Sequence, residues 1–216
     1  MGRPSRRGAL LDAGVDVLHR RGYAAASVES ITEAVGVPKG AFFKHFGSKE
    51  AFASEALRRY FERWQQQIAP VFNDPKVRAV QKLRAMLAAA TSGAEKSSYS
   101  FGCLIGNLSA ELSGEHDSVR QTLVEIFRDW AGSFEGVIKA GQQAGELSLA
   151  LSPARTARFI VNGLQGAQLR CKVDRTSAAL LELEETIFSL LLQPDGRAAQ
   201  AEQSYKKSPG LRRRER

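Results

Sequence analysis

The chain has 216 residues, of which 43% are hydrophobic and 25% are charged, so it can bury an ordinary core in one domain or in two small coupled ones. No apolar run approaches the roughly 20 residues that a membrane-spanning helix needs, and an amphipathic segment follows the N-terminus. We therefore expect no signal peptide and no membrane partner. The two cysteines are too few for a disulfide framework or a zinc cluster, which favours the reducing cytoplasm.

The net charge of +8 is concentrated toward the two ends of the chain. Residues 1–50 hold eight basic and five acidic side chains, and residues 194–216 hold seven and three. Residues 51–193 are nearly neutral, with sixteen basic and fifteen acidic side chains. A basic end suggests a polyanionic partner, although a solvated charged segment has the same composition. We expect residues 194–216 to form a basic, disordered tail.

Helical periodicity dominates the sequence and strand alternation is nearly absent, which predicts an all-α fold. Gly22 is the expected end of the first helix, Ser27 and Ser48 are expected N-caps, and Pro70 begins a connection. Ser118 and Gln121 resemble a capping box at the start of a long helix that ends before Gly145. The other predicted helices cover residues 6–21, 28–35, 39–45, 49–67, 76–95, 153–173 and 178–192, with a compact apolar segment at 101–112.

Two short helices joined by a tight turn at Gly36 suit DNA binding, with the second helix in the major groove and the first across the backbone. Gly40, at the start of the second helix, lets free backbone N–H groups approach phosphate. The expected packing residues of the first short helix are Val28, Ile31, Ala34 and Val35. The candidate DNA-binding residues are Ser27, Lys39, Gly40, Phe42, Phe43, Lys44, His45 and Lys49.

Each of these candidates also has a simpler explanation. The three lysines can be solvated charges on an amphipathic bundle, and His45 can pack instead of binding a phosphate or a base edge. Phe42 and Phe43 can lie outward or beneath the helix, and Phe46 is expected in the core. The basic arm, with Arg3, Arg6 and Arg7, can reach the DNA backbone or minor groove, or move freely.

Residues 6–55 resemble the N-terminal signature of the TetR family. The family often has Thr and Tyr where this chain has Ala41 and Phe43, so two hydroxyls that would reach phosphate are missing. The resemblance implies a dimeric regulator with an N-terminal three-helix DNA-binding domain, residues 1–50, and a larger helical ligand-binding and dimerisation domain, residues 51–193. The residues that carry it are Gly22-Tyr23, Ser27 to Val37, Pro38-Lys39-Gly40-Ala41-Phe42-Phe43-Lys44-His45-Phe46 and Ser48-Lys49-Glu50-Ala51.

A second, shorter resemblance concerns the segment from Phe101 to Leu108, which contains Gly-Cys-Leu-Ile-Gly-Asn. It is similar to a TetR subgroup whose members include regulators that respond to electrophiles or oxidants. The glycines beside Cys103 predict a thiol that its neighbours shield little, and the resemblance implies Lys172 as a nearby cation that raises the thiolate fraction. The alternative is that Cys103 is a small buried hydrophobe. Cys171, next to Lys172, is either a second thiol of the site or a packing residue, and we expect it to pack.

Aromatic residues at helical spacing give a candidate ligand pocket, although core packing explains the same spacing. We assign Phe101, Phe127 and Trp130 to the sensor site with Cys103 and Lys172. Further members of the same apolar set are Trp64, Met86, Tyr99 and Phe134.

The last two predicted helices carry more apolar residues than one core stripe needs, which predicts a two-fold dimer surface with close helix contact at Gly163 and Gly166. Burial within the chain is the alternative. The residues of this surface are Leu180, Leu183, Ile187, Phe188, Leu190, Leu191 and Leu192.

No catalytic motif is recognisable, and none of the three histidines lies in a metal or nucleophile motif, so we expect neither an enzyme nor a cofactor. The sequence predicts a DNA-binding transcriptional regulator of a pseudo-palindromic operator, by family default a repressor, released by a small-molecule effector. That effector is either an electrophile or oxidant sensed at Cys103 or a non-covalent pocket ligand. A ligand-independent DNA-binding protein and an enzyme with an incidental helix-turn-helix are the remaining alternatives.

Overall fold

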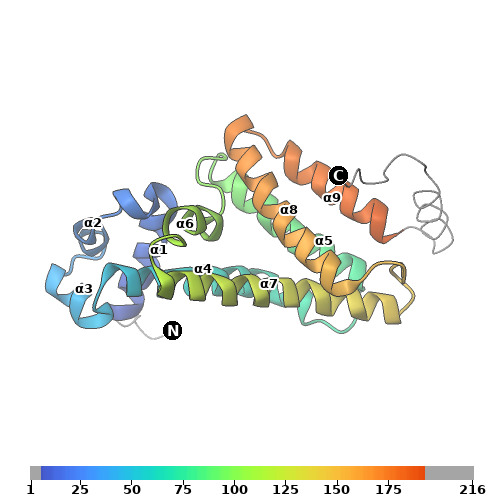
Figure 1. Cartoon of the computed structure of the whole chain (residues 1–216), viewed down its shortest axis with the longest axis horizontal. Helices are drawn as coiled ribbons and strands as arrows, with labels where there is room; N and C mark the ends of the chain where they lie inside the picture. Colours follow the sequence, from blue (N-terminus) through green and yellow to red (C-terminus); the bar gives the residue numbers. More distant parts are fainter. Residues whose placement is uncertain (1–5, 193–216) are drawn as a thin grey trace, which may run out of the picture.

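The computed structural model describes residues 6–192, and all regular structure in this range is helical (Figure 1). The all-α fold class is confirmed. The predicted basic tail at 194–216 lies outside the described residues. The helices are α1 (Arg6–Ala25), α2 (Val28–Glu33), α3 (Lys39–Phe46), α4 (Lys49–Phe72), α5 (Ala79–Lys96), α6 (Leu104–Leu112), α7 (Asp117–Gln143), α8 (Pro153–Asp174) and α9 (Ala178–Leu191).

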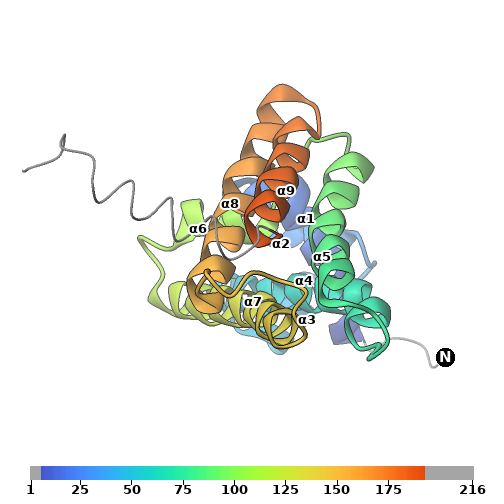
Figure 2. The same cartoon turned by 90° about the vertical axis from the view of Figure 1, so that its right-hand side faces the viewer.

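The helices form a small N-terminal group and a larger body. In Figure 1, α1, α2 and α3 gather at one end, and α5, α8 and α9 cross over the layer of α4 and α7. Figure 2 shows α8 and α9 side by side, and α5 packs against both. The helices α4 and α7 run in the same direction, because Arg58 pairs with Glu125 and Trp64 lies beside Trp130 further along. No helix within residues 6–192 is long and apolar enough to cross a membrane.

An aromatic cluster holds the N-terminal group together. Phe42 and Phe46 of α3 meet Phe52 of α4, with ring centroids 4.9 Å and 4.8 Å from that of Phe52. A Cβ atom on Gly14 of α1 would lie 2.0 Å from Cζ of Phe52, so only glycine lets α1 approach α4 this closely. Arg59 of α4 donates to both carboxylate oxygens of Asp12 in α1, at 2.8 and 3.2 Å, and ties the same two helices together outside the cluster.

Several predicted helix boundaries are confirmed by their caps. Ser27 Oγ accepts a hydrogen bond of 3.0 Å from the Ser30 N–H, and Ser48 Oγ accepts one of 3.1 Å from the Ala51 N–H. Gly22 has φ 75° and ψ 176°, which breaks the helical path inside α1 where the sequence predicts the helix to end.

Three local expectations are wrong. Pro70 lies inside α4, where its exposed position lets water bind the carbonyl that its missing N–H leaves free. The predicted capping box at Ser118 does not form, because α7 starts at Asp117 with His116 as N-cap and no side-chain cap. Ala34 is exposed and Thr32 is buried in its place, because α2 ends at Glu33 and Ala34 lies beyond its last turn.

The outer face of α8 and α9 carries several large exposed apolar side chains, of which Leu190 and Leu192 belong to the predicted surface and the others do not. Four members of the predicted surface, Leu180, Ile187, Phe188 and Leu191, are buried inside the chain. Gly163 also faces inward, since a Cβ there would lie 2.8 Å from Leu183 Cδ1. The large apolar side chains that α8 and α9 expose are Phe159, Leu169, Val173, Leu181, Leu190 and Leu192.

Candidate DNA-binding and ligand-binding sites

The outer face of α3 carries most of the predicted DNA-binding residues. Phe43 is 43% exposed, whereas Phe42 is 0% exposed and packs on Phe46 and Phe52. The prediction that Phe42 contacts DNA is therefore wrong: Phe46 follows Phe42 by four positions, about one helical turn, so both lie on the inner face of the helix. On the side of α3 that faces away from the cluster, Lys39, Gly40 and Lys44 are also exposed, and His45 is half-buried.

The two lysines at the ends of this region have different surroundings. Lys39 is exposed and forms an ion pair with Glu29 of α2, and this hydrogen bond lowers the pKa of the Glu29 carboxyl. Lys49 is turned inward: its Nζ donates a 2.7 Å hydrogen bond to the Tyr23 carbonyl and lies 4.2 Å from the centroid of the Tyr23 ring. The structure thus places Lys49 in packing at the end of α1, in place of the predicted phosphate contact.

Of the basic arm, Arg7 is held against the protein. It pairs with Glu55 of α4, and its guanidinium carbon lies 5.1 Å from the centroid of the Phe46 ring. Arg6 is exposed, and Arg3 lies outside the described residues.

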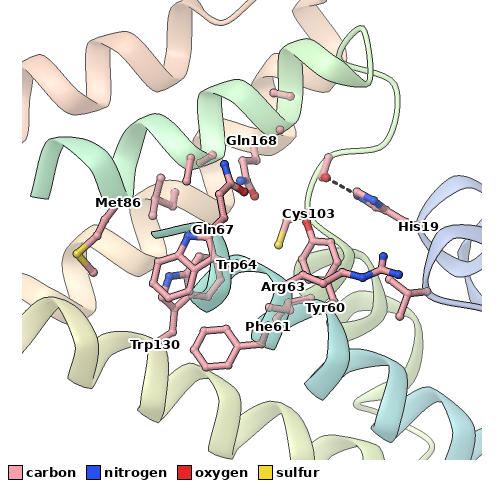
Figure 3. A pocket seen from close by; sticks show the side chains of 18 residues that line it. His19, Tyr60, Phe61, Arg63, Trp64, Gln67, Met86, Cys103, Trp130 and Gln168 are labelled. Carbon is pink, nitrogen blue, oxygen red and sulfur yellow. Dashed lines mark hydrogen bonds between the residues drawn. The ribbon is translucent and has the colours of Figure 1, made fainter. Parts of the chain in front are cut away.

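A cavity of about 210 Å³ lies in the larger body, lined by residues of α1, α4, α5, α6, α7 and α8. Figure 3 shows Met86 and Trp130 toward one end and Tyr60 and Cys103 toward the other. Its apolar wall includes Phe61, Trp64, Met86, Ile105, Trp130 and Leu164, and its polar residues include His19, Tyr60, Arg63, Cys103 and Gln168.

Of the five predicted sensor residues, Cys103 and Trp130 line this cavity, whereas Phe127, Phe101 and Lys172 do not. Phe127 stacks on Trp130, with centroids 6.5 Å apart, and lines a separate groove between α7 and α8. Phe101 packs between α1 side chains, 5.5 Å from His19 and 5.6 Å from the Arg20 guanidinium carbon. The prediction that Phe101 and Phe127 line the pocket is wrong, because nearby residues on the same helix or turn face different sides.

The Cys103 side chain is well shielded, contrary to expectation. The residue is 6% exposed, and burial raises the pKa of its thiol. The backbone N–H groups of Gly106 and Ile105 and the Gln165 amide, whose nitrogen is 3.7 Å from Sγ, lower that pKa, but burial is the larger effect. The raised pKa favours the protonated thiol, which is the opposite of the predicted high thiolate fraction.

Lys172 lies close to the Gly102–Cys103 segment but not on the cavity. A Cβ on Gly102 would lie 3.7 Å from Lys172 Cδ, and Lys172 lines a polar recess with Arg20, Arg21 and Glu111. Its charge lowers the pKa of His19, for which burial is the main cause. It is not among the groups that shift the pKa of Cys103.

Two contacts connect the cavity wall to the N-terminal helices. His19 of α1 donates its Nε2–H to the Gly102 carbonyl over 2.8 Å, one residue before Cys103 (Figure 3). Glu111 of α6 accepts from the N–H groups of Tyr23 and Ala24, at 2.8 and 3.1 Å, just after the break at Gly22. Sequence reasoning missed both residues, although a helix break that frees N–H groups is a signal for a nearby acceptor.

Comparisons with known proteins agree with this architecture. Residues 10–56 match the family model described as bacterial regulatory proteins, tetR family, and residues 79–187 match the tetracyclin repressor-like C-terminal domain. The HTH-type transcriptional repressor DhaR of Mycobacterium sp. (strain GP1) is 38% identical over 192 residues, which cover 89% of this chain and 95% of DhaR. The transcriptional regulator AcuR of Cereibacter sphaeroides is 29% identical, over 77% of this chain and 76% of AcuR.

A solved structure has the same fold over nearly its whole length. The regulatory protein TetR from Rhodobacter sphaeroides superposes with a TM-score of 0.78 at 27% identity, covering 85% of this chain and 97% of that one. The helix-turn-helix, the helical body and these matches agree, and the chain belongs to the TetR family of DNA-binding transcriptional regulators.

Proposed function

We propose that this chain is a repressor that a small molecule releases from its operator by binding, without a covalent bond, in the 210 Å³ cavity. The observation that carries the proposal is the position of that cavity. Its wall includes Gly102 and Cys103, and the Gly102 carbonyl holds His19 of α1, the helix that also packs on α2 and α3. A ligand that shifts this wall changes the position of the DNA-binding helices, provided that it binds the two arrangements with different affinity.

The DNA contacts in this proposal come from the exposed side of α3 and from the N-terminus of α2. Lys39 and Lys44 neutralise phosphates, Gly40 allows the backbone to approach the duplex, and Ser27 and His45 add hydrogen bonds. Phe43 takes the place of a residue that would offer a hydroxyl, and it makes an apolar contact instead.

Two copies of the chain are needed to read two half-sites. We assign the dimer contact to the exposed apolar face of α8 and α9, where Leu169 and Val173 are exposed and where Gly166 has no neighbouring atom within 4 Å of an added Cβ. A two-fold bundle of these helices would place two α3 helices for successive major grooves, about 34 Å apart. This dimer acts in the cytoplasm, where the operator is.

A cavity-filling substitution tests the ligand part of the proposal. Ala90 of α5 lines the cavity, whereas Ala88, two residues before it, is exposed on the other side of the helix. In Ala90→Leu we expect unchanged operator affinity but about tenfold more compound for half-release, because added side-chain volume competes with the ligand. The measurement is fluorescence anisotropy of an operator selected from random duplexes, titrated with small neutral aromatic and aliphatic compounds.

The matched control is Ala88→Leu, which adds the same volume outside the cavity and keeps the wild-type response. Equal responses of Ala90→Leu and wild type to every releasing compound would place the effector elsewhere. If no compound releases the operator, the result would favour the alternative of a ligand-independent regulator.

Covalent sensing at Cys103 is a second candidate, because the thiol lines the cavity and lies at the N-terminus of α6, where a thiolate is stabilised once it forms. In this case Sγ adds to one carbon of an activated C=C bond, the π bond opens, and the adjacent carbon takes up a proton from solvent in place of the one that the thiol releases. N-ethylmaleimide and the unreactive N-ethylsuccinimide separate the two candidates, since they have nearly the same shape.

We expect slow labelling of Cys103 by N-ethylmaleimide, because the thiol is buried and its pKa is raised, and we expect Cys103→Ser to keep its release by non-covalent compounds. The readouts are intact mass over time and operator release, with Cys171→Ser as the control for the second thiol. Rapid release by the maleimide alone, abolished in Cys103→Ser and kept in Cys171→Ser, would establish the covalent candidate instead.

A further inference from the structure

We propose that the cavity binds a small neutral molecule whose polar group both accepts and donates a hydrogen bond, such as a carboxamide or an alcohol on an apolar body. This inference rests on the proposed function and names the chemical class of its effector. It follows from two buried polar atoms in the cavity wall, from the aromatic surface around them and from the pairing of the nearby charges.

The first polar atom is the indole nitrogen of Trp130. The residue is 4% exposed, and its Nε1–H has no hydrogen-bond partner within residues 6–192. A buried indole N–H usually finds an acceptor, and leaving it unpaired costs stability. Since Trp130 lines the cavity, an occupant of the cavity can supply that acceptor (Figure 3).

The second polar atom is the side-chain carbonyl oxygen of Gln168 in α8. This Oε1 atom is buried and is also without a partner in the described part of the chain. The indole N–H can only donate, and the amide oxygen can only accept. An occupant that satisfies both atoms therefore needs an acceptor and a donor, which one amide or one hydroxyl group provides.

The remainder of the wall suits an apolar body. Phe61 stacks on Trp64 with centroids 5.4 Å apart, and Trp64 lies 5.6 Å from Trp130. An apolar cavity of roughly 150 Å³ is known to bind benzene, so about 210 Å³ admits a single ring with a small substituent.

The charges around the cavity disfavour an anionic ligand. Among the described residues that line it, Arg63 is the one guanidinium or ammonium, and it already binds Asp16 at 2.8 Å and Asp12 at 3.1 Å. A carboxylate entering the cavity would lose its hydration without gaining a free cation.

Benzamide, benzoate and toluene test this assignment, because they share a ring and differ in the polar group. Calorimetric titration of the full chain at neutral pH should show benzamide binding about tenfold more tightly than toluene, as two hydrogen bonds to buried atoms require. Benzoate should show no binding. Trp130→Phe and Gln168→Met should each weaken benzamide about fivefold and leave toluene unchanged.

Trp64→Phe is the matched control, since it makes the same replacement in the same cavity at a residue without an unpartnered buried atom in the described chain. It should affect benzamide and toluene equally. Two results would overturn the inference. One is benzoate with an affinity equal to that of benzamide. The other is a Trp64→Phe protein that loses affinity for benzamide but not for toluene, as Trp130→Phe is expected to do.

The operator assay separates this inference from the proposed function. Benzamide that binds through Trp130 without releasing operator would support the ligand class and contradict the release mechanism. Operator released by other compounds equally in wild type, Trp130→Phe and Gln168→Met would support release and contradict the ligand class.

Discussion

Phe42→Ala is expected to abolish operator binding although Phe42 is buried and is not on the exposed side of α3. The side chain is fully buried between Phe46 and Phe52, so its removal leaves a cavity at the junction of α3 and α4. Truncation of a buried phenylalanine costs about 3–5 kcal/mol, a large part of the stability of a small domain. The helix-turn-helix should therefore unfold partly, which chemical denaturation followed by circular dichroism and operator anisotropy would both record.

Two neighbouring variants separate loss of fold from loss of contact. Phe43→Ala removes a side chain that is 43% exposed and should leave the unfolding free energy nearly unchanged. Lys44→Ala should also stay folded, weaken binding to all duplexes, and reduce the slope of log affinity against log salt by about 1. A Phe42→Ala protein that unfolds like wild type but has an altered base preference would show that Phe42 reads DNA after all.

The N-terminal group was the part of the chain that sequence predicted best. Its boundaries are marked by residues with a local physical role: Gly22 at a positive φ breaks α1, Ser27 caps α2, and Ser48 caps α4 directly after α3. The orientation of side chains within α3 was less certain, because a run of Phe42, Phe43 and Phe46 has more aromatic residues than one packed face can hold. The four-residue spacing puts Phe42 and Phe46 on one face of α3, and the structure shows that this face is the one that packs on Phe52.

The residues that line the cavity could not be predicted from the sequence, for a different reason. Its wall comes from helices distant in the chain, so the aromatic pattern of α7 indicates a buried face but not which ring borders empty space. Trp130 and Phe127 stack on each other, yet only Trp130 lines the cavity. The thiol of Cys103 was misjudged for the same reason: two glycines leave space beside it in the sequence, and Tyr60 and Gln165 from other helices fill that space.

The second large effect is expected at His19, which connects the cavity wall to the DNA-binding helices. His19→Phe keeps an aromatic ring between Tyr60 and Phe101, whose centroids lie 5.2 and 5.5 Å away, but it cannot donate to the Gly102 carbonyl. We expect His19→Phe to bind effector and operator separately and to lose most of the coupling between them. Coupling in such proteins is typically 1–3 kcal/mol, so wild type should lose operator affinity by about 5–150-fold at saturating effector.

The coupling can be measured from both sides because it is reciprocal: operator must weaken effector binding by the same factor as effector weakens operator binding. Both titrations should give a factor close to one in His19→Phe. His19→Gln keeps a side-chain donor and should retain part of the wild-type factor, which distinguishes a lost hydrogen bond from a lost ring. Thermal unfolding of both variants controls for the cost of leaving the Gly102 carbonyl unpaired, about 1–3 kcal/mol. If a folded His19→Phe protein keeps the wild-type coupling factor, the signal reaches α1 by another contact. The next contact to test is that of the Glu111 carboxylate with the N–H groups that follow Gly22.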